Sequence, residues 1–108
     1  MNRLDQFMGI KIDLEKMEES AKEACKFLKI LSNTDRLLLL CHISQAEKCV
    51  GELEEALDIH QPTLSQQLTV LRNEGFVQTR RDGKQIYYSL KNTVALQVMD
   101  VLLKNYCI

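Results

Sequence analysis

The sequence predicts a mainly α-helical domain with a β-hairpin wing, the winged helix-turn-helix class. Three observations carry this prediction. Leucines spaced three and four apart give residues 61–74 the period of an amphipathic helix, and Gly75 follows as a helix stop. Two alternating runs then flank Asp82-Gly83, a strong hairpin-turn signal. A chain of 108 residues with 45% hydrophobic residues suits one core, so residues 1–108 are expected to form a single domain.

Three helices are expected before residue 61. Asp13 can cap a first helix over residues 13–31, where apolar side chains repeat at three and four. Thr34 can cap a second helix, roughly residues 35–46, which is apolar nearly all round and is therefore expected at the centre of the fold. A short third helix follows from the spacing of Val50, Leu53 and Leu57.

The remaining elements complete the order α-α-α-α-β-β-α. Pro62 stands in the first turn of the fourth helix, where its missing N–H costs little. The strands are predicted at Phe76–Arg81 and Lys84–Leu90, and the last helix at Thr93–Cys107. The side chains expected inward on the fourth helix are Leu64, Leu68 and Leu71, and those expected on one side of the last helix are Val94, Val98, Val101, Leu102 and Tyr106.

Charge is unevenly distributed along the chain. The formal net charge is −1, which by itself argues against a nucleic-acid partner. Residues 1–60 hold 8 Lys or Arg and 12 Asp or Glu, whereas residues 61–91 hold 5 and 2. The basic excess therefore falls on the fourth helix and the hairpin, where a DNA contact is expected.

Hydropathy indicates a cytoplasmic protein with no membrane partner. No apolar run approaches the roughly 18 residues of a membrane span, and the N-terminus lacks the pattern of a signal peptide. The four cysteines are then expected to be reduced thiols rather than a disulfide framework.

The outward face of the fourth helix is polar, and residues 65–71 carry no charge. An ordinary surface helix would carry Lys, Glu and Arg there, whereas glutamine can pair with adenine and hydroxyls can bind bases or phosphates. The pattern favours a helix that reads double-stranded DNA. The candidate reading residues are Gln61, Thr63, Ser65, Gln66, Gln67 and Thr69, of which Gln67 is nearest the core flank.

The hairpin tip concentrates cations around one tight turn. Arg80, Arg81, Lys84 and Gln85 surround Asp82-Gly83 and are the candidate wing contacts to the DNA backbone. The alternative is a solvated tip whose charges protect the sheet edge.

With these elements in place, residues 20–108 resemble the ArsR/SmtB family of bacterial repressors. The matching segments are Leu31–Leu37, Val50–Leu53, Leu64–Leu68, Val70–Arg72, Glu74-Gly75 and Tyr87–Leu90. The resemblance implies a homodimer formed by the first and last helices. It also implies binding to an inverted-repeat operator and release when an inducer reaches a sensing site. The family usually has histidine at the position of Gln67.

Metal sensing is common in that family, but its ligand patterns are incomplete here. The Cys-Val-Cys of arsenic and cadmium sensors is reduced to Cys49-Val50-Gly51, and residues 92–108 contain neither His nor Glu. His42 and His60 are eighteen residues apart on different elements. No set of three or four ligands with short spacings can be assembled, so no metal and no cofactor is expected. A metal-sensing repressor of the same fold stays the alternative, as does a redox-insensitive one.

The resemblance implies a thiol pair instead. A subgroup that includes BigR, SqrR, YgaV and HlyU carries one cysteine in the second helix and one near the end of the last, and senses reactive sulfur species or oxidants. Cys41 and Cys107 fall on those positions. One thiolate would react and the other would close a disulfide or polysulfide bridge. Cys25 is expected to pack in the first helix, and Cys49 to be exposed and reactive.

Two other functions are disfavoured. A thiol enzyme is not expected, because no cysteine lies in a Cys-x-x-Cys motif or beside an oxyanion-binding setting. A winged helix that binds a protein would lack the salt dependence that phosphate contacts impose.

Overall fold

The computed structural model describes residues 13–107, which form five helices and a three-stranded antiparallel sheet. The helices are α2 (Leu14–Leu31), α3 (Thr34–Gln45), α4 (Val50–Ala56), α5 (Thr63–Asn73) and α6 (Thr93–Tyr106), and the strands are β1 (Lys48–Cys49), β2 (Val77–Asp82) and β3 (Gln85–Leu90). Across these residues the predicted winged helix-turn-helix order is confirmed, with β1 as an unpredicted addition.

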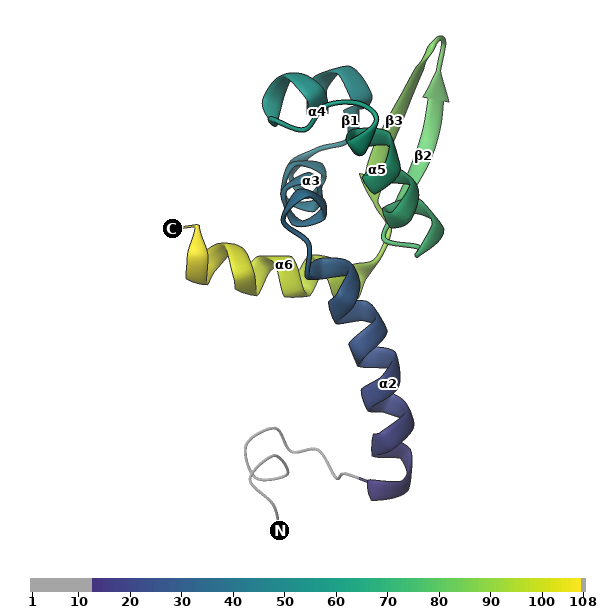
Figure 1. Ribbon diagram of the computed structural model, residues 1–108, viewed down its shortest axis with the longest axis vertical. Helices are drawn as coiled ribbons and strands as arrows, with labels where there is room; N and C mark the ends of the chain where they lie inside the picture. Colours follow the sequence, from purple (N-terminus) through teal and green to yellow (C-terminus); the bar gives the residue numbers. More distant parts are fainter. Residues whose placement is uncertain (1–12, 108) are drawn as a thin grey trace.

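Helix α3 is the centre of the fold, as its apolar composition predicted. It packs against α2, α5, α6 and β3, and its Leu39 and Leu40 are fully buried. Figure 1 shows α6 passing beside α3, and α2 extending away from the body of the domain. The predicted inward residues of α5, Leu64, Leu68 and Leu71, all lie in the core.

The helix caps are formed by short polar side chains, which satisfy N–H groups that have no partner inside the helix. Asp13 caps α2 as predicted, accepting from the N–H of Glu15 at 2.9 Å. The prediction for the next helix was wrong by one residue: Asn33, not Thr34, caps α3 through a 3.0 Å bond from the N–H of Arg36. Pro62 likewise stands at the cap position of α5, one residue before the helix.

Gly75 ends α5 as predicted. Its φ of 76° places it in the left-handed region. The N–H of Gly75 donates to the carbonyl of Arg72, and the N–H of Phe76 donates to that of Leu71. This pair of bonds is the Schellman motif. Phe76 lies in the core rather than in the strand, and its ring stacks on Phe27 of α2 with centroids 5.0 Å apart. The chain therefore leaves α5 in a fixed direction toward the wing.

The hairpin turn is displaced by one residue from the predicted Asp82-Gly83. Asp82 pairs with Gln85 in the ladder, so the loop consists of Gly83 and Lys84. Gly83 has φ 61° and no residue other than glycine has a positive φ in the part of the chain that the structure describes. That combination fits a type II′ turn, which needs glycine at the first central position only. Lys84 is consequently at the tip and not in a strand.

The burial of α6 differs from the prediction. Its most buried side chains are Ala95 and Met99, while Val98 and Leu102 pack at the edge of the core. The other residues predicted for that side are exposed: Val94, Val101 and Tyr106. Helix α6 therefore presents apolar surface on more than its core side.

Candidate nucleic-acid interface and thiol pair

The first turn of α5 uses one of the predicted reading residues for its own structure. Pro62 has no side-chain group that could cap the helix. The Oε1 atom of Gln61 instead accepts from the N–H of Ser65 at 3.0 Å. Gln61 therefore satisfies an N–H of the first turn, and its side chain is held at the start of α5.

The exposed face of α5 carries four of the predicted reading residues: Thr63, Ser65, Gln66 and Thr69. The hydroxyl of Thr69 donates to the carbonyl of Ser65 at 2.8 Å, which leaves its oxygen able to accept. This face is uncharged, and the helix that carries it packs against β2 of the hairpin.

Gln67 is placed differently. It is half-buried, and its Oε1 atom accepts from Nη1 of Arg36 at 3.0 Å. The Gln67 side chain therefore lies at the boundary between the exposed and buried faces of α5 and is hydrogen-bonded to α3. Arg36 was not among the residues that the sequence singled out.

The wing divides its cations into two groups. Arg80 forms a bidentate ion pair with Glu47 and its guanidinium carbon lies 4.7 Å from the centre of the Tyr87 ring. The hydrogen bond from Arg80 holds the pKa of the Glu47 carboxyl below its ordinary value. Among residues 13–107, the Arg81 side chain donates only to the carbonyl of Gly83 at the tip, 3.2 Å away, and the side chains of Lys84 and Gln85 are exposed. Arg81 and Lys84 are therefore the better placed cations for a phosphate.

The predicted thiol pair lies on two packed helices. Cys41 is half-buried in α3, and Cys107 is exposed at the C-terminal cap of α6, where its N–H donates to the carbonyl of Leu103 at 3.0 Å. Burial raises the pKa of the Cys41 thiol, and the nearby Cys107 thiol raises that pKa further. Asp100, one turn before Leu103, is paired with Lys104 at 2.9 Å.

The two other cysteines are placed opposite to expectation. Cys49 was expected to be exposed, yet it is buried at the start of α4, where its N–H donates to the Glu52 carboxylate at 3.1 Å. Cys25 was expected to pack, yet it is exposed on α2. Two different features explain these placements. Cys49 belongs to β1, which pairs with β3, whereas Cys25 lies on α2, most of which extends beyond the core.

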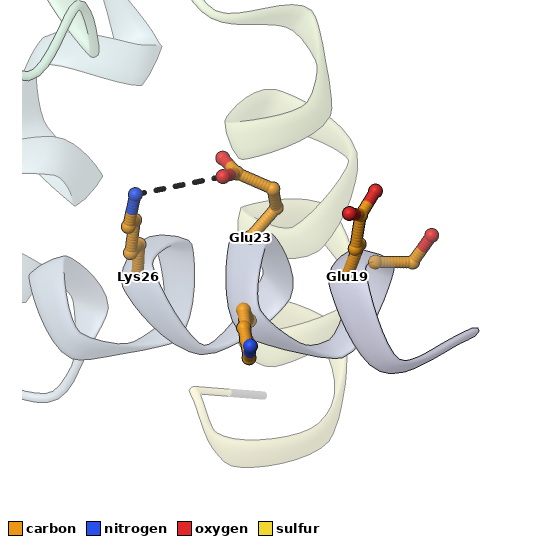
Figure 2. Close-up of a pocket in the computed structure, with 5 residues that line it drawn as sticks. Glu19, Glu23 and Lys26 are labelled. Carbon is orange, nitrogen blue, oxygen red and sulfur yellow. Dashed lines mark hydrogen bonds and ion pairs between the residues drawn. The ribbon is translucent and has the colours of Figure 1, made fainter. Parts of the chain in front are cut away.

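A shallow surface hollow lies along α2 and is lined by Glu19, Ser20, Lys22, Glu23 and Lys26. Figure 2 shows Glu19, Glu23 and Lys26 on this one helix, with Lys26 and Glu23 paired at 3.5 Å. Since one helix supplies all its walls, the hollow encloses no site for a ligand. Within residues 13–107, no three His, Cys, Asp or Glu side chains cluster as a metal site would require.

Comparison with known proteins supplies the family. A model described as "Bacterial regulatory protein, arsR family" matches residues 33–79. The chain is 49% identical over 96 residues to a biofilm growth-associated repressor of Agrobacterium fabrum, a match that covers 89% of this chain and 82% of that protein. The chain belongs to the arsR family of bacterial regulatory proteins.

Solved structures agree with this ArsR protein in fold. The transcriptional repressor BigR of Xylella fastidiosa has a TM-score of 0.80 at 47% identity, covering 88% of this chain and 94% of that one. Reduced HlyU of Vibrio cholerae has a TM-score of 0.83 at 35% identity, covering 87% and 99%. The predicted resemblance to BigR and HlyU is confirmed. Membership of a family of transcriptional regulators also confirms the prediction that the protein is not an enzyme.

The family match spans α3 to the start of β2 and so includes the whole of α5. The residues that sequence reasoning missed, Arg36 and Glu47, act through partners 31 and 33 residues away. No local pattern reveals such pairs.

Along residues 13–107, no helix has the length and apolar character needed to span a membrane.

Proposed function

We propose that this ArsR protein is a transcriptional repressor that binds an inverted-repeat operator as a homodimer and is released by reactive sulfur species or oxidants. The observation that carries the DNA-binding part is the exposed, uncharged polar face of α5, together with the exposed cations Arg81 and Lys84 at the wing tip. Its 49% identity to a protein described as a repressor supports the direction of regulation.

The two surfaces have separate tasks in this proposal. Gln66, Thr63 and Ser65 read base edges in the major groove, because their side chains offer donors and acceptors without charge. Arg81 and Lys84 contact phosphates, which fix the register of the protein on the duplex but carry no sequence information. Thr69 serves as an acceptor, since its proton is donated to the helix backbone.

Operator selection from random duplexes tests this division. The reduced protein is expected to select an inverted repeat, and Gln66→Ala is expected to change the preferred base at one position of each half-site. Arg81→Ala is expected to weaken binding to all sequences about equally. An unchanged base profile for Gln66→Ala would remove Gln66 from the reading set.

A homodimer is supported by the distribution of exposed apolar side chains. Seven of the nine large hydrophobic side chains that are exposed in the described residues lie on α2 and α6. These are Leu14, Met17, Leu28, Val94, Leu96, Val101 and Tyr106. Exposed apolar side chains concentrated on two helices are typical of a protein interface, so a second copy of the chain is proposed to cover α2 and α6.

The sensing chemistry assigned to Cys41 and Cys107 follows from their exposure. The exposed Cys107 thiolate attacks the outer sulfur of a persulfide RSSH. The S–S bond of RSSH breaks, RSH leaves, and Cys107 becomes a persulfide. The Cys41 thiolate then attacks the inner sulfur and expels HS⁻, giving the disulfide. Two thiols and one RSSH thus yield one disulfide, one RSH and one H₂S. Retention of further sulfur atoms would give a polysulfide bridge.

Bridge formation can affect DNA binding because α6 packs against α3, and α3 packs against the reading helix α5. A disulfide requires Cα atoms roughly 4.4–6.8 Å apart, so closure ties the end of α6 to α3 at that spacing. In a dimer that uses α6, any shift of α6 that accompanies closure changes the separation of the two α5 helices. That separation must match half-sites about one DNA turn apart, roughly 34–36 Å.

Mass spectrometry after persulfide treatment tests the thiol assignment. The wild type is expected to show a Cys41–Cys107 crosslinked peptide together with loss of operator binding. Cys41→Ser is expected to retain binding after treatment, with Cys107 trapped as a persulfide. Cys25→Ser is the matched control, because Cys25 is also exposed but lies outside the pair. A persulfide response that survives Cys41→Ser would refute the assignment.

A further inference from the structure

The side chain of Arg36 touches two helices other than its own. It stands in the first turn of α3, where Asn33 accepts from its backbone N–H. Its guanidinium points back to the end of α2: Nε donates to the carbonyl of Ile30 at 2.8 Å, and Nη2 donates to that of Lys29 at 3.1 Å. These carbonyls belong to the last turn of α2, where backbone acceptors lack partners inside the helix and a cation is favoured by the helix dipole.

The third donor of the same group reaches α5. Nη1 donates to Oε1 of Gln67 at 3.0 Å. Gln67 follows the exposed Gln66 and precedes Leu68, whose side chain is anchored in the core. A guanidinium is planar and rigid, so the directions of its donors are fixed relative to one another. The last turn of α2 and the reading helix are therefore joined through one stiff group on α3.

We propose that Arg36 is a positioning residue, which sets the orientation of α5 relative to the end of α2 through Gln67. Gln67 thus holds the reading helix instead of contacting a base. This inference rests on the proposed DNA reading by α5. The end of α2 is thereby connected to α5: Arg36 donates two hydrogen bonds to the α2 backbone and one to Gln67. A shift of α2 in the dimer would therefore move Gln67 and the neighbouring Gln66.

A double-mutant cycle on the full chain separates positioning from base contact. Arg36→Lys keeps the charge but loses the fork, and Gln67→Met keeps the length but loses the acceptor. Each is expected to lower affinity for the selected inverted repeat by roughly tenfold, and the double variant is expected to lose no more than either single one. Gln67→Glu, which still accepts from Arg36, is expected to restore most of the affinity.

The base-preference profile supplies a readout that a general loss of stability would not reproduce. Gln67→Met is expected to leave the preferred sequence unchanged, whereas Gln66→Ala is expected to change it. A new base preference for Gln67→Met, or additive losses in the Arg36 and Gln67 cycle, would overturn the inference. Should Arg36→Lys fail to fold, the profile of Gln67→Met alone decides.

Amide hydrogen exchange of the protein without DNA tests the Arg36–Gln67 link independently of operator binding. Faster exchange of α5 amides in both variants is expected if the link orders α5, whether or not the protein selects an operator. Unchanged α5 exchange would overturn the link. A wild-type protein that selects no duplex would instead refute the DNA-reading proposal.

Discussion

Arg80 of β2 and Glu47, which precedes β1, form a bidentate ion pair across 33 residues of sequence. The Arg80 guanidinium also lies over the Tyr87 ring of β3. One side chain therefore ties both strands of the wing to the segment that leaves α3. The carboxylate compensates the charge of Arg80, which separates this residue from the other cations of the hairpin.

Arg80 is expected to fix the wing rather than contact phosphate. In the charge-reversed double variant Glu47→Arg/Arg80→Glu, the pair is retained with opposite polarity, so operator affinity is expected to stay within a few-fold of the wild type. The single variant Arg80→Glu places two carboxylates together and is expected to bind much more weakly. Fluorescence anisotropy with a labelled operator measures both affinities.

Salt dependence provides the matched control for this prediction. Each phosphate contact contributes about 0.9 to the slope of log affinity against log salt. Arg81→Ala and Lys84→Ala are each expected to lower the slope by about that amount per protomer, whereas Arg80→Ala leaves it unchanged. A lowered slope for Arg80→Ala, or failure of the double variant to bind, would show that Arg80 meets the DNA.

Local patterns predicted the helices, the hairpin and the buried leucines because each depends on neighbouring residues. Gly75 was predictable as a helix end since only a few residues adopt its φ of 76° readily. Strand β1 was not, because two residues carry no periodicity and their pairing depends on β3. The partner choices of Arg36 and Arg80 were equally hidden, because they are set by the tertiary fold.

The candidate site likewise has features that the sequence predicts and features that only the tertiary fold determines. The exposed uncharged face of α5 followed from its helical period, yet the period could not tell that Gln67 is bonded to Arg36 and Gln61 to Ser65. The pairing of Cys41 with Cys107 came from family resemblance, since 66 residues separate them and no spacing rule connects positions so distant.

Alanine is expected to change the free energy of unfolding in opposite directions at Gly51, within α4, and at Gly75, which ends α5. Gly75→Ala places a side chain at φ 76°, which costs roughly 1–2 kcal/mol, although no atom lies within 4 Å of the added carbon. Gly51→Ala lies within α4 and also meets nothing within 4 Å, so it is expected to stabilise by about 0.5–1 kcal/mol.

Urea denaturation measures both changes in the free energy of unfolding. Gly75→Asn is the control, because asparagine tolerates the left-handed region, and it is expected to lose less stability than Gly75→Ala. Equal losses for the two substitutions would mean that backbone conformation is not the cause.

Alkylation of Cys41 is expected to have an unusually alkaline pH dependence. Because the pKa of Cys41 is raised by burial and then by Cys107, its thiolate fraction at neutral pH is smaller than that of a free cysteine. The rate with iodoacetamide should therefore keep rising at pH values where a free cysteine has reached its plateau. Peptide mass spectrometry of a pH series gives the midpoint for this site.

Removing the second thiol checks the order of the two causes. Cys107→Ser deletes the smaller contribution to the raised pKa, so the Cys41 midpoint should fall but stay above that of free cysteine. A midpoint at or below the free-cysteine value in the wild type would contradict the burial of Cys41. It would also favour Cys41 over Cys107 as the first thiol to react.

Interruption of the apolar surface on α6 is expected to separate the proposed dimer. Val101 is 58% exposed, so Val101→Glu leaves the core of the protomer intact while placing a charge in the interface. Analytical ultracentrifugation should show the wild type at twice the chain mass and this variant at the chain mass. Operator affinity is expected to fall by more than a hundredfold, because one α5 then reads one half-site.

Ile86→Glu is the control for oligomeric state, since Ile86 is 42% exposed but lies on β3, away from both helices. It should remain dimeric, which would show that a new surface charge alone does not dissociate the protein. A dimeric Val101→Glu would exclude this part of α6 from the interface. In that case bridge closure at Cys107 could not act on the spacing of the two α5 helices through α6, and the release mechanism would need another route.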